Sequence, residues 1–434
     1  MMSQAFINAR LIDPKQGLDE QGTLVVENGK VAAIGRKVQP PPEAEQIDAS
    51  GLVLLPGLVD MQVFIGEPGT EYRETLATAS QAAAAGGVTS LIMMPNTNPV
   101  IDDAALVDFI SRRARDTALV RVHPMAAITK GIKGKQLTEF ALLQEAGAVA
   151  FTDGNRAVMN AQTMCRALAY ATNFNALIMH HASDRNLVGA GVMNSGALAM
   201  RLGLAGIPVA AETIMIERDI RLVALTGARL HIAQISSAES VDIIRAAKKR
   251  GLHVTCGVSA THLMLNERDV ANYRTFAKLD PPLRTEEDRL ALIAGVADGT
   301  IDVIVSAHNP QDEDAKRRPF AQAEYGSIGV ETLLASALTL YHDNQIDLAR
   351  LIDSVTAKPA QLLGLSAGHL AVGAAADFCL LDLDKPFVVD SDALHSKSKN
   401  AAMEGRKLQG RLVYTSVGGK TVFTKSHSSR RIGA

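Results

Sequence analysis

The feature that most constrains the fold is a repeated alternation of short apolar runs with longer helical patterns. Eight apolar segments of strand length follow one another, and stretches with apolar residues at three- and four-residue spacing separate them. Strands that alternate with helices predict a parallel sheet, and eight such units predict a (β/α)8 barrel of the TIM type. The predicted strands are residues 58–64, 89–94, 120–128, 148–152, 176–180, 229–235, 252–258 and 303–306.

The intervening helices are predicted from the same periodicity. Apolar residues recur at the spacing of one helix face in residues 71–85, 161–171, 237–250, 286–297 and 329–341. The carboxyl ends of the strands meet at one face of such a barrel, which is where barrel enzymes carry their active sites. We therefore expect functional side chains just after the strands.

Both ends of the chain have the pattern of antiparallel strands. Residues 5–13 and 23–35 alternate or run apolar, with Asn28-Gly29 as a hairpin signal, and residues 377–382, 410–415 and 419–423 do the same. We predict one small β-sandwich domain built from both termini, with the barrel inserted between its halves. The predicted boundaries are 1–57 for the first half, 58–365 for the barrel and 366–434 for the second half.

Charge and composition restrict the possible partners. The 44 basic and 46 acidic residues give a formal net charge of -2, so nucleic acid and anionic membranes are poor candidates. No apolar stretch reaches the roughly 18 residues that a membrane span needs. Three well-separated cysteines form neither a disulfide framework nor a thiolate metal site. These features predict a cytoplasmic protein.

An ordered set of short motifs carries a family resemblance over nearly the whole chain. The set resembles the dihydroorotases of the amidohydrolase superfamily, whose active members use one or two zinc ions to make hydroxide and to polarise a cyclic amide. The resemblance implies the same barrel and small β domain. The motifs are residues 56–60, 67–69, 94–99, 151–153, 278–284, 298–302 and 398–400.

The resemblance also implies where the zinc ligands and the general base belong, and most of these positions are changed. A paired histidine motif falls on Gln62 and Phe64, a later histidine falls on Gln234, and the aspartate that serves as ligand and base falls on Ala307. An amide is a poor zinc ligand, and a phenyl ring is none. Of six family positions, only Asp153 and His181 keep their residue types.

The substrate-binding positions have changed as well. The arginine that binds the substrate carboxylate in the family falls on Gly66, whereas the asparagine of the Met-Pro-Asn-Thr motif is kept as Asn96. We expect Asn96 to be the remaining substrate-binding residue. We expect no metal, with Asp153 and His181 hydrogen-bonded inside a former pocket. The alternative is a rebuilt mononuclear site that draws on His180, His231, His262 or His308.

Three functional hypotheses follow from the resemblance. The first is a catalytically inactive dihydroorotase-like protein of pyrimidine biosynthesis, since inactive homologues associate with the catalytic chain of aspartate carbamoyltransferase as structural partners in a hetero-oligomer. The second is an active zinc-dependent cyclic amidohydrolase that converts dihydroorotate to N-carbamoyl-aspartate with an altered metal site. The third is a metal-free homo-oligomeric protein like the dihydropyrimidinase-related proteins. We favour the first, because the metal positions, the base and the carboxylate clamp are lost together.

Overall fold

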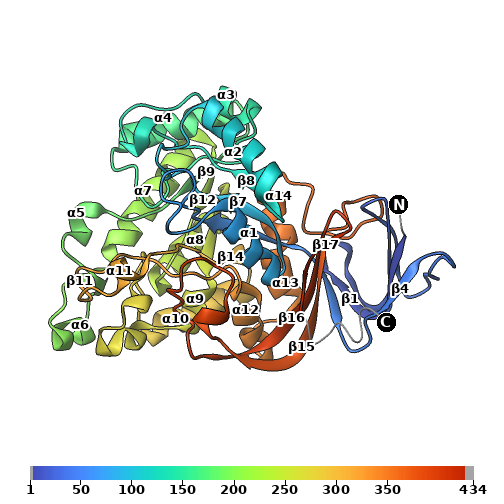
Figure 1. Cartoon of the computed structure of the whole chain (residues 1–434). Helices are drawn as coiled ribbons and strands as arrows, with labels where there is room; N and C mark the ends of the chain where they lie inside the picture. Colours follow the sequence, from blue (N-terminus) through green and yellow to red (C-terminus); the bar gives the residue numbers. More distant parts are fainter. Residues whose placement is uncertain (1–2, 426–434) are drawn as a thin grey trace.

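The computed structural model describes residues 3–425, and its larger part is a barrel of parallel strands ringed by helices (Figure 1). This architecture confirms the predicted fold class. One barrel sheet has the order β6-β7-β8 and the other has the order β14-β13-β12-β9. The strands are β6 (Leu58–Val63), β7 (Val88–Met93), β8 (Arg121–Pro124), β9 (Leu177–His180), β12 (Arg229–Ile232), β13 (Val254–Ser259) and β14 (Val303–Val305).

Single bridges close the two sheets into a ring. Phe151 bridges Ala126 on one side and Ile178 on the other, and His308 bridges Val63 beyond the end of β14. The predicted strand over 148–152 is therefore shorter than expected, with Phe151 as its one bridged residue. It still supplies the eighth position of the barrel, because Phe151 bridges the segments on both of its sides.

Helices cover the outside of the barrel, and two of them begin later than predicted. Thr75 caps the first helix in a reciprocal box with Thr78, so residues 71–75 belong to a loop over the carboxyl end of the barrel. The helix predicted from residue 329 starts at Leu333. The helices around the barrel are α1 (Leu76–Ala85), α2 (Ala104–Thr117), α3 (Phe140–Glu145), α4 (Ala161–Thr172), α7 (Ala210–Thr226), α8 (Ala238–Lys249), α10 (Glu286–Ala297), α12 (Leu333–His342), α13 (Leu348–Val355) and α14 (Ala357–Leu363).

Shorter elements lie in the connections after the barrel strands. The strands β10 and β11 pair in parallel, and α9 follows β13 directly. Their bounds are α5 (Arg185–Val188), β10 (Met193–Asn194), α6 (Ala197–Leu202), β11 (Gly206–Ile207), α9 (Ala260–Met264) and α11 (Glu313–Lys316). No helix between residues 3 and 425 is both long and apolar enough to cross a membrane.

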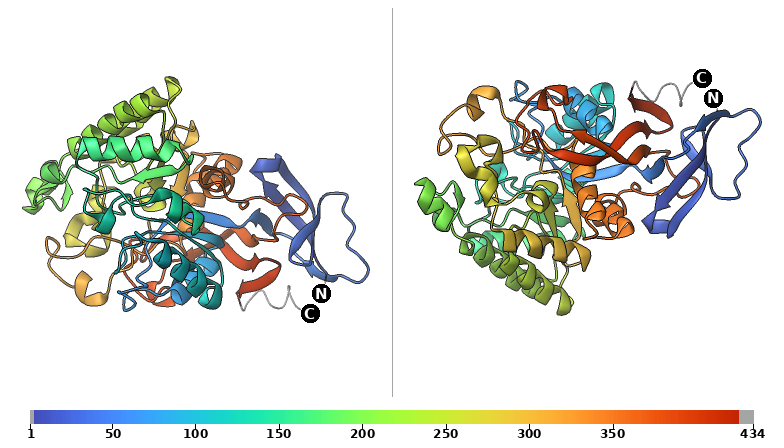
Figure 2. Two further views of the ribbon diagram at one scale, coloured as in Figure 1. Left: turned by 90° about the horizontal axis from the view of Figure 1, so that it is seen from above. Right: turned by 90° about the horizontal axis from the view of Figure 1, so that it is seen from below.

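The two ends of the chain join in one eight-stranded sheet with the order β17-β16-β15-β5-β1-β2-β3, and β4 pairs with β1. Phe6 from the first half packs 4.8 Å from Phe378 of the second, so both halves enclose one core. Figure 2 shows β15 to β17, in red, between the barrel and the blue strands. The bounds are β1 (Gln4–Asp13), β2 (Leu18–Glu27), β3 (Lys30–Gly35), β4 (Glu45–Asp48), β5 (Val53–Pro56), β15 (Phe378–Val388), β16 (Lys407–Val417) and β17 (Lys420–Thr424).

An ion pair ties the small domain to the barrel. Arg121, at the start of β8, donates through Nε and Nη2 to the two carboxylate oxygens of Asp377 at 2.7 and 3.2 Å. The Gly418 amide donates to the same carboxylate. Because Asp377 is buried and its charge is met by a two-pronged donor, this contact fixes the sheet against the amino end of the barrel strands.

Candidate functional site

A cavity of about 70 Å³ lies at the carboxyl ends of the barrel strands. The strand ends bring six of the family positions considered in the sequence to its wall: Gln62, Phe64, Asn96, His181, Gln234 and Ala307. Residues that were far apart along the chain therefore share one site, as barrel topology requires. Asp280, Ser306, His308 and Tyr325 line the same cavity.

Asp153 does not line the cavity. Its carboxylate accepts hydrogen bonds from the Thr129 amide at 2.9 Å and from the Thr129 hydroxyl at 2.5 Å. Burial raises its pKa above the ordinary value, although both bonds oppose that rise. Both carboxylate oxygens thus have partners in the protein.

His181 faces a carboxylate that the sequence motifs did not single out as a site residue. Its Nε2 lies 3.3 Å from Asp280 Oδ1. Burial alone would lower the pKa of His181, but the Asp280 charge raises it above the ordinary value, and His181 in turn holds the pKa of Asp280 down. Asp280 lies within the 278–284 motif, so position in that motif was the only available signal.

The other histidines each have a separate partner, although His262 and His308 line the same cavity as His181. His180 Nδ1 lies 2.6 Å from Asp219 Oδ2, and its Nε2 accepts from the Val158 amide. His231 and His262 bond to Thr255 and Ser259 respectively. Among residues 3–425, no three His, Cys, Asp or Glu side chains form a group that could hold a metal ion. The geometry does not support a rebuilt mononuclear site.

The fourth candidate histidine, His308, closes the barrel. Its Nδ1 accepts from the Gly329 amide at 3.2 Å, which leaves its proton on Nε2, 3.5 Å from the buried Glu74. The Glu74 carboxylate itself accepts hydrogen bonds from the Ser396 hydroxyl and the Lys397 amide. His308 therefore links strand β14 to the loop after β6 and to the segment near residue 396.

Three positions that differ from the family have a clear structural setting. The Phe64 ring is covered by the Arg73 guanidinium at 4.3 Å. Gly66 has no room for a side chain, because a Cβ there would overlap the Thr70 carbonyl oxygen. Ala307 has a φ of 50°, a left-handed conformation that asparagine and aspartate adopt more readily than alanine.

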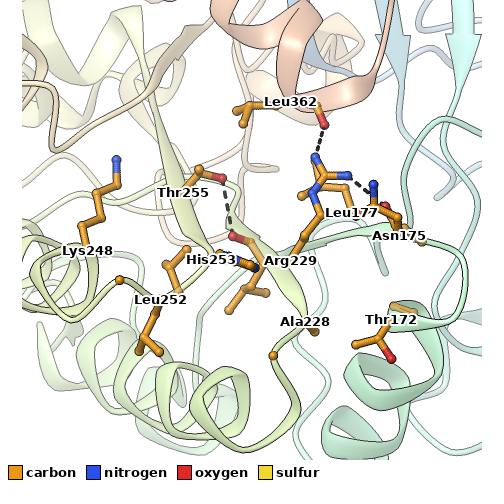
Figure 3. Close-up of a pocket in the computed structure, with 16 residues that line it drawn as sticks. Thr172, Asn175, Leu177, Ala228, Arg229, Lys248, Leu252, His253, Thr255 and Leu362 are labelled. Carbon is orange, nitrogen blue, oxygen red and sulfur yellow. Dashed lines mark hydrogen bonds between the residues drawn. The ribbon is translucent and has the colours of Figure 1, made fainter.

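A larger hollow of about 620 Å³ lies at the opposite end of the barrel, beside the amino ends of β9, β12 and β13 (Figure 3). The two cationic side chains on its wall, Arg229 and Lys248, already have partners. Arg229 donates to the Asn175 and Leu362 carbonyl oxygens, and Lys248 pairs with Asp302 at 2.6 Å instead of lying free in solvent. We assign no chemistry to this end.

Comparison with known proteins identifies the family. The model of the "Dihydro-orotase-like" family matches residues 51–240, and that of the "Amidohydrolase family" matches residues 330–423. The dihydroorotase of Geotalea daltonii is 45% identical over 416 residues, which is 96% of this chain and 98% of that protein. The chain belongs to the dihydroorotase family. The dihydroorotase of Pelobacter propionicus is 45% identical over 418 residues and covers 96% and 99% of the two chains.

Solved structures share the fold of this dihydroorotase-family chain. The L-hydantoinase (dihydropyrimidinase) of Arthrobacter aurescens superposes with a TM-score of 0.88 at 26% identity, over 98% of this chain and 97% of that one. The dihydropyrimidinase of Brevibacillus agri shares the fold, with a TM-score of 0.84 at 22% identity over 98% and 95% of the two chains.

The residues of this family member do not fit a zinc ion. Zinc sites in proteins use three or four thiolate, imidazole or carboxylate ligands. The cavity wall offers three imidazoles, and each has its own partner: His181 faces Asp280, His262 bonds to Ser259 and His308 accepts from the Gly329 amide. Gln62, Phe64, Gln234 and Ala307 stand at the other family positions, and Asp153 bonds to Thr129. The names of the related proteins state neither inactivity nor a partner.

Proposed function

We propose that this protein is a dihydroorotase-family member that does not hydrolyse cyclic amides. One observation carries the proposal: the four positions where the family resemblance places imidazoles and the catalytic carboxylate hold Gln62, Phe64, Gln234 and Ala307, and all four line one cavity. None of these side chains can deliver hydroxide at neutral pH, and none is a base. A metal-bound nucleophile and a positioned base each lower a barrier by several kcal/mol, so their joint loss leaves little catalysis.

The test is the turnover of dihydroorotate by purified protein that has been incubated with zinc and dialysed. We expect no hydrolysis above the rate of a His181→Ala variant. Turnover that the His181→Ala change abolishes would overturn the proposal, because it would require a catalytic site built around this imidazole.

For its role we propose a structural partner of the aspartate carbamoyltransferase catalytic chain in pyrimidine biosynthesis. Support comes from the resemblance to inactive dihydroorotase homologues that assemble with that chain. The measurement is light scattering after size-exclusion chromatography of the protein mixed with the catalytic chain from the same organism. One complex larger than either component is expected, and two separate peaks with unchanged masses would contradict the assembly.

A second candidate is an active zinc-dependent amidohydrolase with an altered site. The names of the relatives favour it, since proteins 45% identical over 96% of this chain are called dihydroorotases. A third candidate is a metal-free homo-oligomer like the dihydropyrimidinase-related proteins, and the likeness in fold to an L-hydantoinase (dihydropyrimidinase) structure is in keeping with it. Turnover of dihydroorotate would support the active amidohydrolase. A homo-oligomer that does not bind the transcarbamoylase would support the protein like the dihydropyrimidinase-related proteins.

A further inference from the structure

Two buried lysines lie under the long connection between β14 and α12. Lys278 is 2% exposed and Lys316 is 3% exposed. Within the described part of the chain, neither side chain forms an ion pair with a carboxylate, and both donate to backbone carbonyl oxygens. We call residues 312–325 the cover segment, because it contains Lys316 and supplies four of the five acceptor oxygens. The two lysines therefore hold this segment from its inner side.

Lys278 is bonded as a charged ammonium group. Its Nζ donates at 2.9, 3.0 and 2.7 Å to three carbonyl oxygens of the cover segment, those of Phe320, Ala321 and Ala323. Three acceptors match the three N–H groups of a protonated lysine. The Tyr325 ring, 4.5 Å from the same Nζ, also favours a cation. The fold thus accommodates the positive charge of Lys278.

Lys316 is bonded as a neutral amine would be. Its Nζ donates to the carbonyl oxygens of Thr275 and Glu324 at 3.0 and 2.6 Å, and the described residues offer it no third acceptor. Two acceptors match the two N–H groups of a neutral amine, whereas an ammonium group would bury an unpaired donor. Burial lowers the pKa of Lys316 from 10.5 to about 7.

Most of the charges that face Lys316 oppose its protonation. Lys278 and, from the loop after β6, Arg73 both act to lower its pKa, whereas the Glu324 carboxylate acts to raise it. Burial has a larger effect than any of these charges. A proton on Lys316 therefore places a second buried cation beside Lys278 without a paired carboxylate.

The cover segment adjoins the cavity at the carboxyl ends of the barrel strands. Helix α11 lies within the segment (Figure 1). Tyr325, the last residue of the segment, lines the cavity together with Gly326 and Ser327, and so does Asn309 shortly before the segment begins. A displacement of the cover segment therefore changes the wall of this cavity.

We propose that the cover segment is a pH-sensitive cover of this cavity, held closed while Lys316 is a neutral amine and loosened when that amine takes up a proton. In an open segment Lys316 would meet water and regain its ordinary pKa of 10.5, whereas the closed segment holds the pKa near 7. The open form binds the proton more tightly, so closure weakens as pH falls from about 10.5 to about 7. Below about pH 7 both forms are protonated, and closure weakens no further.

Hydrogen exchange measured by mass spectrometry on the full chain tests the opening. After correction for the intrinsic pH dependence of exchange, protection of the amides in residues 312–327 should be at least about tenfold lower at pH 7 than at pH 9. Strand β12 serves as the internal reference, and its protection should change much less. Equal protection of residues 312–327 at the two pH values would overturn the proposal.

Substitutions assign the effect to one amine. Lys316→Gln keeps N–H donors but cannot take up a proton, and Lys316→Met removes the donors as well. The pH dependence of protection should disappear in both variants, whether the segment is closed or open. Lys249→Met is the control, because Lys249 is exposed at the end of α8, and it should keep the native pH dependence.

The titration of Lys316 can also be followed directly. NMR of the native protein with 13C-labelled lysines should show one amine that titrates near pH 7 and is missing from Lys316→Gln. A Lys316 signal that titrates near pH 10.5 would contradict the proposal. Native pH dependence of protection in both Lys316 variants would contradict it as well.

Discussion

The guanidinium of Arg73 lies 4.3 Å from the centre of the Phe64 ring and donates at 2.7 Å to both Asn309 Oδ1 and Pro310 O. Phe64 follows strand β6, and Asn309 follows β14. The arginine therefore bridges the two strand ends that close the barrel. The phenyl ring of Phe64 thus makes a structural contact with the Arg73 guanidinium.

Replacing Arg73 tests how much this bridge contributes to the stability of the fold. Arg73→Met should lower the free energy of unfolding by about 1–3 kcal/mol, because it removes a cation–π contact and two charge-assisted hydrogen bonds. Urea denaturation measures the loss. Arg112→Met is the matched control, since Arg112 is exposed and should change stability by no more than about 0.5 kcal/mol. Equal effects of the two changes would show that the bridge contributes nothing.

Gly66 explains why one substitution cannot restore the family's carboxylate clamp. Gly66→Arg should unfold or severely destabilise the protein, because its Cβ would meet the carbonyl oxygens of Thr70 and Glu74. Gly66→Ala should already lower the melting temperature. Gly196→Ala is the comparison, since a Cβ there meets only the Asn194 amide at 3.9 Å. A stable Gly66→Arg protein that binds dihydroorotate would refute the steric argument.

Ala307 carries strain where the family has an aspartate. A left-handed backbone costs a residue with a Cβ about 1–2 kcal/mol, so Ala307→Gly should raise the free energy of unfolding by up to about 1 kcal/mol. The same change at Ala297, exposed at the end of α10, should lower it by about 0.5–1 kcal/mol. Calorimetry on both variants checks the opposite signs. A similar loss of unfolding free energy in both variants would contradict backbone strain at Ala307.

The raised pKa of the buried Asp60 carboxyl predicts that the stability of the protein depends on pH. Burial raises its pKa to about 6 from an ordinary value of 3.8, so the folded protein holds a proton that the unfolded chain has already released. The contribution of Asp60 to the free energy of unfolding is therefore lost as pH rises from about 4 to about 6. The stability of Asp60→Asn relative to the native protein should improve over that interval by about 3 kcal/mol at most. Denaturation curves at several pH values measure this difference, and a constant difference would contradict the raised pKa.

The barrel could be predicted from sequence because strand and helix periodicities differ and repeat eight times. The convergence of Gln62, Gln234 and Ala307 followed from the same topology, which places all strand ends on one face. The fourth strand was predicted too long, since apolar composition cannot separate a bridged residue such as Phe151 from a full strand.

Long-range side-chain pairs were not predictable. His181 meets Asp280, and Arg73 meets Asn309 across 236 positions, and no local pattern encodes either contact. The unpaired state of Gln62 and Asn96 depends on every neighbouring side chain at once, so it too required the structure. The sequence showed which family positions are changed, whereas the structure showed which contacts surround Phe64 and Gly66 at two of them.

The measurement that tests the central claim most directly is the zinc content of the purified protein beside that of a Gln62→His, Phe64→His, Gln234→His, Ala307→Asp variant. Both are dialysed against the same micromolar zinc buffer, quantified by mass spectrometry and assayed with dihydroorotate. The native protein should hold well below one zinc per chain and turn over no substrate, while the fourfold variant should take up zinc. One or more zinc ions per native chain, together with hydrolysis of dihydroorotate, would contradict the account.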